Sequence, residues 1–77
     1  MKNNKNYSTS QMLINENPFG AYHELVKTKE LDEKYMTNLN YLRKIHMNNR
    51  KVLTTNDEIE LTRAVLTHMN FSGDFIK

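Results

Sequence analysis

The sequence predicts an all-α protein, a small bundle of about three helices with a disordered N-terminal tail. Beyond residue 17, apolar residues recur every three or four positions, which is the period of an amphipathic helix. Helix-start signals stand at Asn17-Pro18 and at residues 55–58, TNDE. The one β-prone stretch between them, residues 51–54, is too short and isolated to pair as a strand. These observations together favour helices throughout.

The chain is long enough for one domain with a small core. It has 77 residues, of which 38% are hydrophobic, and its mean hydropathy is −0.78. A domain of this size is only marginally stable on its own core. It contains no cysteine, so no disulfide or thiolate–metal site can add to that core. Well-packed helices, self-association or a partner must supply the remaining stability.

The N-terminal region divides into a tail and a short apolar patch. Residues 1–7 are polar and rich in Asn, and we expect them to form a disordered tail. A single small helical domain is then expected over residues 8–77. Residues 8–10 can cap one helical turn that carries the apolar patch at 12–14. We expect this patch to fold back onto the domain, and the alternative is a docking segment for a partner.

Two helices are expected in the first half of the domain. Asn17 can cap the first of them, and Pro18 at the first helical position loses no hydrogen bond. This helix is expected to end between Thr28 and Glu30. The second helix carries apolar residues at spacings of four, four, three and three: Leu31, Tyr35, Leu39, Leu42 and Ile45. The apolar stripes of the two helices differ in phase by more than a quarter turn, so we expect a break between Thr28 and Asp32 rather than one long helix.

The last helix is the best marked. Thr55 and Glu58 have the spacing of a capping box, with Thr55 as the cap. A broad apolar arc follows: Ile59, Leu61, Val65, Leu66 and Met69. Asn70 can end this helix, and the chain can then turn so that residues 75–76 return to the core.

No catalytic, cofactor or metal site is recognisable in the sequence, so we do not expect an enzyme. Residues 23–27, HELVK, begin like the zinc-protease motif HExxH, but Lys27 stands where the second histidine would be. His46 and His68 have no partner at ligand spacing. With only two glycines in the chain, a backbone cradle for phosphates is not expected.

A basic cluster precedes the last helix. It comprises Arg43, Lys44, His46, Arg50 and Lys51. The helix dipole favours such a cluster at a solvated C-terminus. The functional alternative is a surface for phosphates or for an acidic protein. A DNA-reading helix-turn-helix is disfavoured, because Asp57 and Glu58 begin the helix whose first turn would have to approach the phosphates.

Two methionines mark a candidate contact face. Met36 and Met47 are eleven residues apart, which is three helical turns, and they lie away from the apolar stripe of their helix. Another segment of the chain could cover them, or they could bind a partner, since methionine and arginine suit adaptable interfaces. The residues we predict to bind a partner are Met36, Tyr41, Arg43, Met47, Arg50 and Lys51.

Charge and composition favour a protein that acts by contact. The net charge is +2, with eleven basic and nine acidic residues, which is less asymmetric than in strong nucleic-acid binders. No apolar run approaches the length of a membrane span, so a cytoplasmic protein without membrane contact is expected. The leading hypothesis is a small non-enzymatic protein-binding module, an accessory or inhibitory factor that contacts a host protein. The alternatives are a nucleic-acid-binding module using the Arg43–Lys51 cluster and a self-associating helical subunit such as a homodimer.

The composition also suggests an origin. Asn, Lys, Ile and Tyr, which have A/T-rich codons, make up 27 of the 77 residues, whereas Gly, Ala, Pro and Arg make up 8. An A/T-rich genome is the interpretation, and a bacteriophage or another mobile element would suit so small a protein.

Overall fold

The structure is a computed structural model that describes residues 9–49 and 52–75, and all the regular secondary structure in these ranges is helical. The predicted all-α class is confirmed, but four helices are present instead of about three. The additional helix is the apolar patch near the N-terminus, which forms two turns instead of one. The helices are α1 (Thr9–Glu16), α2 (Pro18–Leu25), α3 (Lys29–Asn49) and α4 (Thr55–Phe71). The predicted tail, residues 1–7, lies outside the described ranges.

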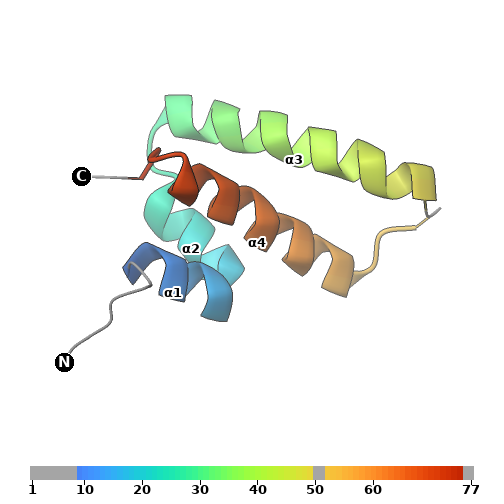
Figure 1. Cartoon of the computed structure of the whole chain (residues 1–77), viewed down its shortest axis with the longest axis horizontal. Helices are drawn as coiled ribbons and strands as arrows, with labels where there is room; N and C mark the ends of the chain where they lie inside the picture. The colour runs from blue at the N-terminus through green and yellow to red at the C-terminus, as the bar shows by residue number, and fades with distance from the viewer. Residues whose placement is uncertain (1–8, 50–51, 76–77) are drawn as a thin grey trace.

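The two long helices form a hairpin, and the two short helices pack beside one of them (Figure 1). α4 contacts each of the other three helices. α1 and α2 contact each other and α4. Within the described ranges, the backbone of α3 comes close to α4 alone among the helices. The first half of α3 is also contacted by the Tyr22 side chain of α2 and by Asp74 after α4.

The apolar patch of α1 folds back onto the domain, as predicted. Ile14 is fully buried in the core. The Gln11 side chain, also buried, donates to the hydroxyl of Thr67 at 3.1 Å and accepts from the Asn70 amide at 3.1 Å. Arg63 donates to the backbone carbonyl of Asn15 at 3.2 Å. Both apolar burial and polar contacts therefore hold α1 on α4.

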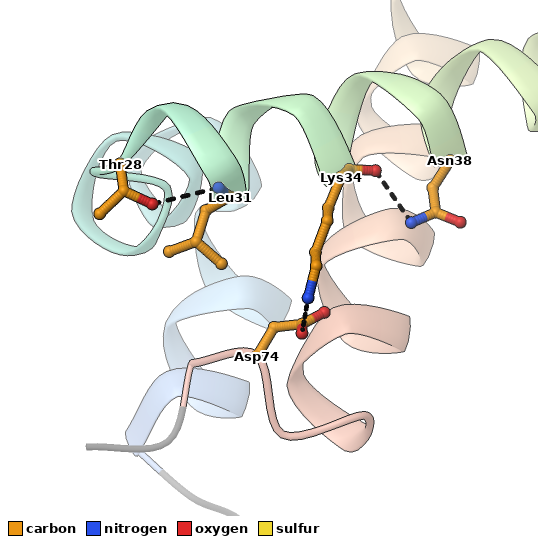
Figure 2. Close-up of polar contacts among 5 residues, drawn as sticks. All are labelled: Thr28, Leu31, Lys34, Asn38 and Asp74. Atoms are coloured by element: carbon orange, nitrogen blue, oxygen red, sulfur yellow. Dashed lines mark hydrogen bonds and ion pairs between the residues drawn. The ribbon is translucent and has the colours of Figure 1, made fainter.

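A break separates α2 from α3, as predicted, but it lies at residues 26–28 instead of between Thr28 and Asp32, because α2 ends at Leu25 and α3 already begins at Lys29. The Asn17 side chain caps α2 by accepting from the Gly20 N–H at 3.1 Å. Thr28 opens α3, because its hydroxyl accepts from the Leu31 N–H at 3.1 Å (Figure 2). A threonine that caps the next helix in this way cannot continue the previous one.

The cap of α4 differs from the prediction by one residue. Thr54, not Thr55, is the cap, and its hydroxyl accepts from the Asp57 N–H at 3.1 Å. The Asp57 carboxylate accepts in return from the Thr54 N–H at 2.9 Å. Two threonines stand side by side here, and each is followed three residues later by an acid, so the sequence allowed both registers. The shorter side chain of aspartate closes the box as glutamate would.

The chain turns back sharply after α4. Gly73 has a φ of 86°, in the left-handed region that glycine adopts at little cost. The next residue, Asp74, accepts from the Lys34 ammonium on α3 at 2.9 Å (Figure 2). Phe75 then returns to the core, as predicted, while Ile76 lies outside the described ranges.

The core lies where α1 and α2 pack against the open end of the hairpin, at the start of α3 and the end of α4. Its buried apolar residues are Ile14, Ala21, Tyr35, Leu39, Val65, Leu66, Met69 and Phe75. One buried polar contact crosses it, from the Tyr35 hydroxyl to the Thr62 hydroxyl at 3.2 Å. None of the described helices is long and apolar enough to cross a membrane.

Candidate protein-contact surface

The surface of α3 carries an unusual share of the exposed apolar residues. The large apolar side chains that are exposed are Met12, Phe19, Met36, Tyr41, Ile45, Met47, Val52 and Phe71. Four of these lie on α3: Met36, Tyr41, Ile45 and Met47. These four side chains are exposed although the opposite side of the helix packs against α4 and Tyr22 of α2.

The apolar stripe predicted on α3 is only partly buried. Tyr35 and Leu39 are buried against α4, but Ile45 at the end of the stripe is 41% exposed. Ile45 follows Leu39 by six positions, which places its side chain about 120° around the helix axis from that of Leu39. The stripe therefore leaves the α3–α4 contact before it ends.

Of the predicted partner-binding residues that the structure describes, Met36, Tyr41 and Met47 do not share one side of α3. Met36 and Met47 share one flank of α3, where they are 39% and 52% exposed. Tyr41, at 65% exposed, lies about 140° around the helix from Met36, on the other flank. Arg50 and Lys51 lie outside the described residues. The structure therefore pairs the methionines and separates Tyr41 from them.

On the Tyr41 flank, α3 and α4 form a shallow groove of about 320 Å³. Its lining residues, which we call the hairpin groove, are Asn38, Tyr41, Leu42, Ala64, Val65 and His68. Val65 forms a fully buried floor, whereas Tyr41 projects from the rim. An apolar centre bordered by an amide and an imidazole has the composition of a protein-contact site.

The groove is open because α1 occupies another face of α4. The α4 residues that hold α1 are Arg63, Thr67 and Asn70. At about 100° per residue, these three positions lie on the side of the helix turned away from Val65 and His68. The short helices of the chain thus cover one side of the hairpin and leave the groove side uncovered.

The sequence contained a signal for this groove that we did not use. Ala64, His68 and Phe71 follow one another at spacings of four and three, so they share one face of α4. The sequence predicts only that His68 has no partner at metal-ligand spacing, and Ala64 belongs to none of the predicted sites. Phe71 continues the same face beyond the groove and is 78% exposed.

Part of the basic cluster is neutralised within the domain. The Arg43 guanidinium donates to the Glu58 carboxylate at 3.0 Å, with about a third of each side chain exposed. His46 Nε2 lies 3.4 Å from the Asp57 carboxylate. Lys44 is exposed. Of the described basic residues, Arg43 is thus held by an acid of α4, and His46 lies beside one.

The Asp57 carboxyl is stabilised in its charged form. The backbone N–H of Thr54 lowers the pKa of Asp57, and the Thr54 hydroxyl and His46 add to this effect. These contacts belong to the cap of α4, so they explain a structural role for the group. Among the described residues, no group of three or more His, Cys, Asp or Glu side chains gathers as a metal site would require.

Comparison of the chain with protein-family models, with curated proteins and with solved structures found no match.

Proposed function

We propose that this protein is a small non-enzymatic binding module, an accessory or inhibitory factor that acts by direct contact with a host protein. The observation that carries this proposal is the hairpin groove. Its centre is apolar and its border is polar. It lies between α3 and α4, on the side of the hairpin that α1 and α2 leave uncovered.

The shape of the groove favours a helical partner segment. Its two walls are helical stripes, from Asn38 to Leu42 on α3 and from Ala64 to His68 on α4. A third helix can pack between two antiparallel helices through residues spaced three and four apart. Tyr41 supplies a large aromatic surface at the rim, and the small side chain of Ala64 allows a partner backbone to approach closely.

Nucleic-acid binding by the Arg43–Lys51 cluster is the second candidate function. The ion pair between Arg43 and Glu58 weakens it, because a phosphate would have to compete with the carboxylate. The two candidates differ in their response to salt. Phosphate contacts weaken steeply as salt rises, whereas an apolar interface around Tyr41 is much less sensitive.

The proposal is tested by affinity capture of partners from a host lysate, with and without nuclease, followed by mass spectrometry. The bait proteins are the wild type, an Ala64→Glu variant and a Met12→Glu variant. Ala64 and Met12 are both exposed on helices, so neither change should unfold the domain. One protein captured by the wild type and by Met12→Glu, but lost with Ala64→Glu, would support the groove as the contact site.

The other outcomes separate the alternatives. Capture that disappears with nuclease would identify nucleic acid as the ligand and move the site to the basic cluster. Capture that survives nuclease and is equal for all three baits would exclude the groove.

A further inference from the structure

We propose that the partner helix of the hairpin groove is basic, with a lysine or arginine side chain that enters a second hollow on the first half of α3. This inference rests on the proposed function, because it names the chemistry of the partner segment that binds at the same site. The second hollow has a volume of about 340 Å³. Its lining residues, which we call the α3 hollow, are Glu30, Glu33, Lys34, Thr37 and Asn38.

The α3 hollow adjoins the hairpin groove. Asn38 lines both of them. Thr37 of the hollow lies four positions before Tyr41 of the groove, so these two side chains share one face of α3. A helix that lies in the groove and continues towards the start of α3 therefore passes over the hollow.

The α3 hollow presents mainly hydrogen-bond acceptors. Its one cation, the Lys34 ammonium, is held by Asp74 at 2.9 Å (Figure 2). The Asn38 amide nitrogen donates to the backbone carbonyl of Lys34 at 3.0 Å, which leaves the side-chain oxygen of Asn38 to accept from a partner (Figure 2). Glu30 and Glu33 are exposed, and neither forms an ion pair within the described part of the chain.

Such a lining selects a positively charged donor. Lysine and arginine side chains carry hydrogen-bond donors and no acceptor, and their bonds to carboxylates are stronger than bonds between neutral groups. A phosphate or an acidic side chain would instead meet the carboxylates of Glu30 and Glu33. The whole chain has a net charge of +2, so the preference for a cation belongs to this hollow and not to the protein surface in general.

The distance between the two hollows sets the spacing of residues in the partner. Glu30 and Glu33 precede Tyr41 by eleven and eight positions, which corresponds to about 12–17 Å along the helix axis. A partner helix that lies along α3 has the same rise per residue. Its basic residue is therefore expected about eight to eleven positions from the apolar residue that packs beside Tyr41.

Selection from a displayed library of random amphipathic helical peptides tests this inference, with the full chain as the target. Peptides are enriched on the wild type, and those that also bind Ala64→Gln are removed. The longer side chain of this variant narrows the groove without adding a charge, so the peptides that remain depend on the groove. They are expected to carry lysine or arginine at the stated distance from an apolar residue more often than the unselected library does.

The affinity of the selected peptides for Glu30→Gln/Glu33→Gln is then measured by fluorescence anisotropy. Exposed ion pairs are individually weak, so loss of both carboxylates is expected to weaken binding about three- to tenfold. Glu16→Gln/Glu24→Gln is the matched control, because these two glutamates are exposed on α1 and α2. It changes the net charge by the same amount and should bind like the wild type.

A second comparison uses the peptide itself. Replacing its basic residue with glutamine should weaken binding to the wild type by a similar factor, and should not weaken binding to Glu30→Gln/Glu33→Gln any further. Equal losses on both proteins would contradict a contact between that residue and the hollow. Circular dichroism checks that all protein variants remain helical.

The other outcomes distinguish this inference from the proposed function. Groove-dependent peptides without an excess of basic residues would overturn the inference and would leave the groove as a site for a helix. Basic peptides that bind equally to the wild type and to Glu30→Gln/Glu33→Gln would overturn it as well. If no peptide distinguishes the wild type from Ala64→Gln, the groove takes no helix, and the groove assignment of the proposed function fails together with the inference.

Discussion

Arg43 on α3 and Glu58 on α4 form an ion pair at 3.0 Å, close to the end of the hairpin where the two helices are joined. The pair links the basic cluster of α3 to the first turn of α4. The sequence predicts that Arg43 contacts a partner, but in the structure its guanidinium forms an ion pair with Glu58. Any substitution of Arg43 therefore changes the hairpin as well as the surface.

The ion pair can be separated from partner binding by exchanging its charges. Arg43→Glu should destabilise the domain by about 1 kcal/mol or less, because the pair is partly exposed and the new carboxylate faces Glu58. The double variant Arg43→Glu/Glu58→Arg should recover most of this loss. Urea unfolding of both variants measures the free energies. Equal instability of the single and double variants would contradict the pairing.

The same double variant tests the prediction from the sequence that Arg43 contacts a partner. The exchange keeps the ion pair but reverses the charge at position 43. If the Arg43 charge itself contacts the partner, the double variant should bind weakly while remaining as stable as the wild type. Retained affinity would show that Arg43 serves the hairpin only.

The anchoring of α1 gives a second prediction, for stability. Ile14→Ala should destabilise the domain by roughly 2–4 kcal/mol, because it leaves a cavity in a fully buried site where α1 meets the core. Met12→Ala is the matched control on the same helix, and because its side chain is 50% exposed the cost should stay within about 0.5 kcal/mol. Thermal or urea unfolding measures both. A small effect at Ile14 would mean that α1 is not held by its apolar face.

Much of this fold follows from local sequence signals. The break before α3 could be predicted because the apolar stripes on either side are out of phase, and the structure supplies the cause in the Thr28 cap. The start of α2 could be predicted from Asn17 and Pro18 for the same local reason. The residue that caps α4 could not be predicted, because Thr54 and Thr55 are each followed by an acid three residues later. Only the folded turn selects Thr54.

The candidate site was less predictable than the fold. Periodicity shows which residues share a helix face, but it does not show which face another helix covers. That choice depends on the packing of α1, which is held on the Arg63 and Asn70 side of α4 by polar contacts with little sequence signature. The groove beside Ala64 is open because α1 packs on the opposite side of α4. Tyr41 is among the predicted partner-binding residues, but only the orientation of α3 on α4 shows that it borders the groove while Met36 lies on the other flank.

The cap of α4 gives a prediction of acid sensitivity. The contacts of the Asp57 carboxylate lower its pKa below the ordinary value of 3.8. A group whose pKa is lowered by folding stabilises the native state above its unfolded pKa, and this contribution is lost as the pH falls through the lower folded value. The free energy of unfolding should therefore fall below about pH 4, and less steeply in Asp57→Asn.

Urea unfolding from neutral to acidic pH tests this cap. Glu60→Gln is the control, since Glu60 is an exposed carboxylate on the same helix, and its pH profile should match that of the wild type. Thr54→Ala should cost about 1 kcal/mol at neutral pH, because the Asp57 N–H loses its acceptor. Identical acid profiles for Asp57→Asn and the wild type would contradict the cap.

The contact between α2 and α3 gives the last prediction, at alkaline pH. The Tyr22 hydroxyl donates to the Asp32 carboxylate at 2.6 Å. This hydrogen bond, together with burial and the negative charge of Asp32, raises the pKa of Tyr22 from 10.0 to about 12. Because the folded pKa is raised, the hydrogen bond contributes its full stability below about pH 10, and the contribution is lost as the pH rises towards 12. Tyr22→Phe should cost about 1.5 kcal/mol at neutral pH, the lower end for a hydrogen bond to a charged group, since the contact is only partly buried.

The alkaline absorbance difference between the wild type and Tyr22→Phe isolates the titration of this one phenol. It should appear near pH 12, well above the ordinary tyrosine value of 10.0. Tyr41→Phe is the control variant, because Tyr41 is 65% exposed. Tyr41→Phe should also leave the free energy of unfolding within about 0.5 kcal/mol of the wild type. A Tyr22 titration near the ordinary value of 10.0 would show that the hydrogen bond to Asp32 does not form in solution. In that case the short connection between α2 and α3 would be held by the Thr28 cap and by the packing of Tyr22 against Tyr35, whose ring centroids are 4.6 Å apart.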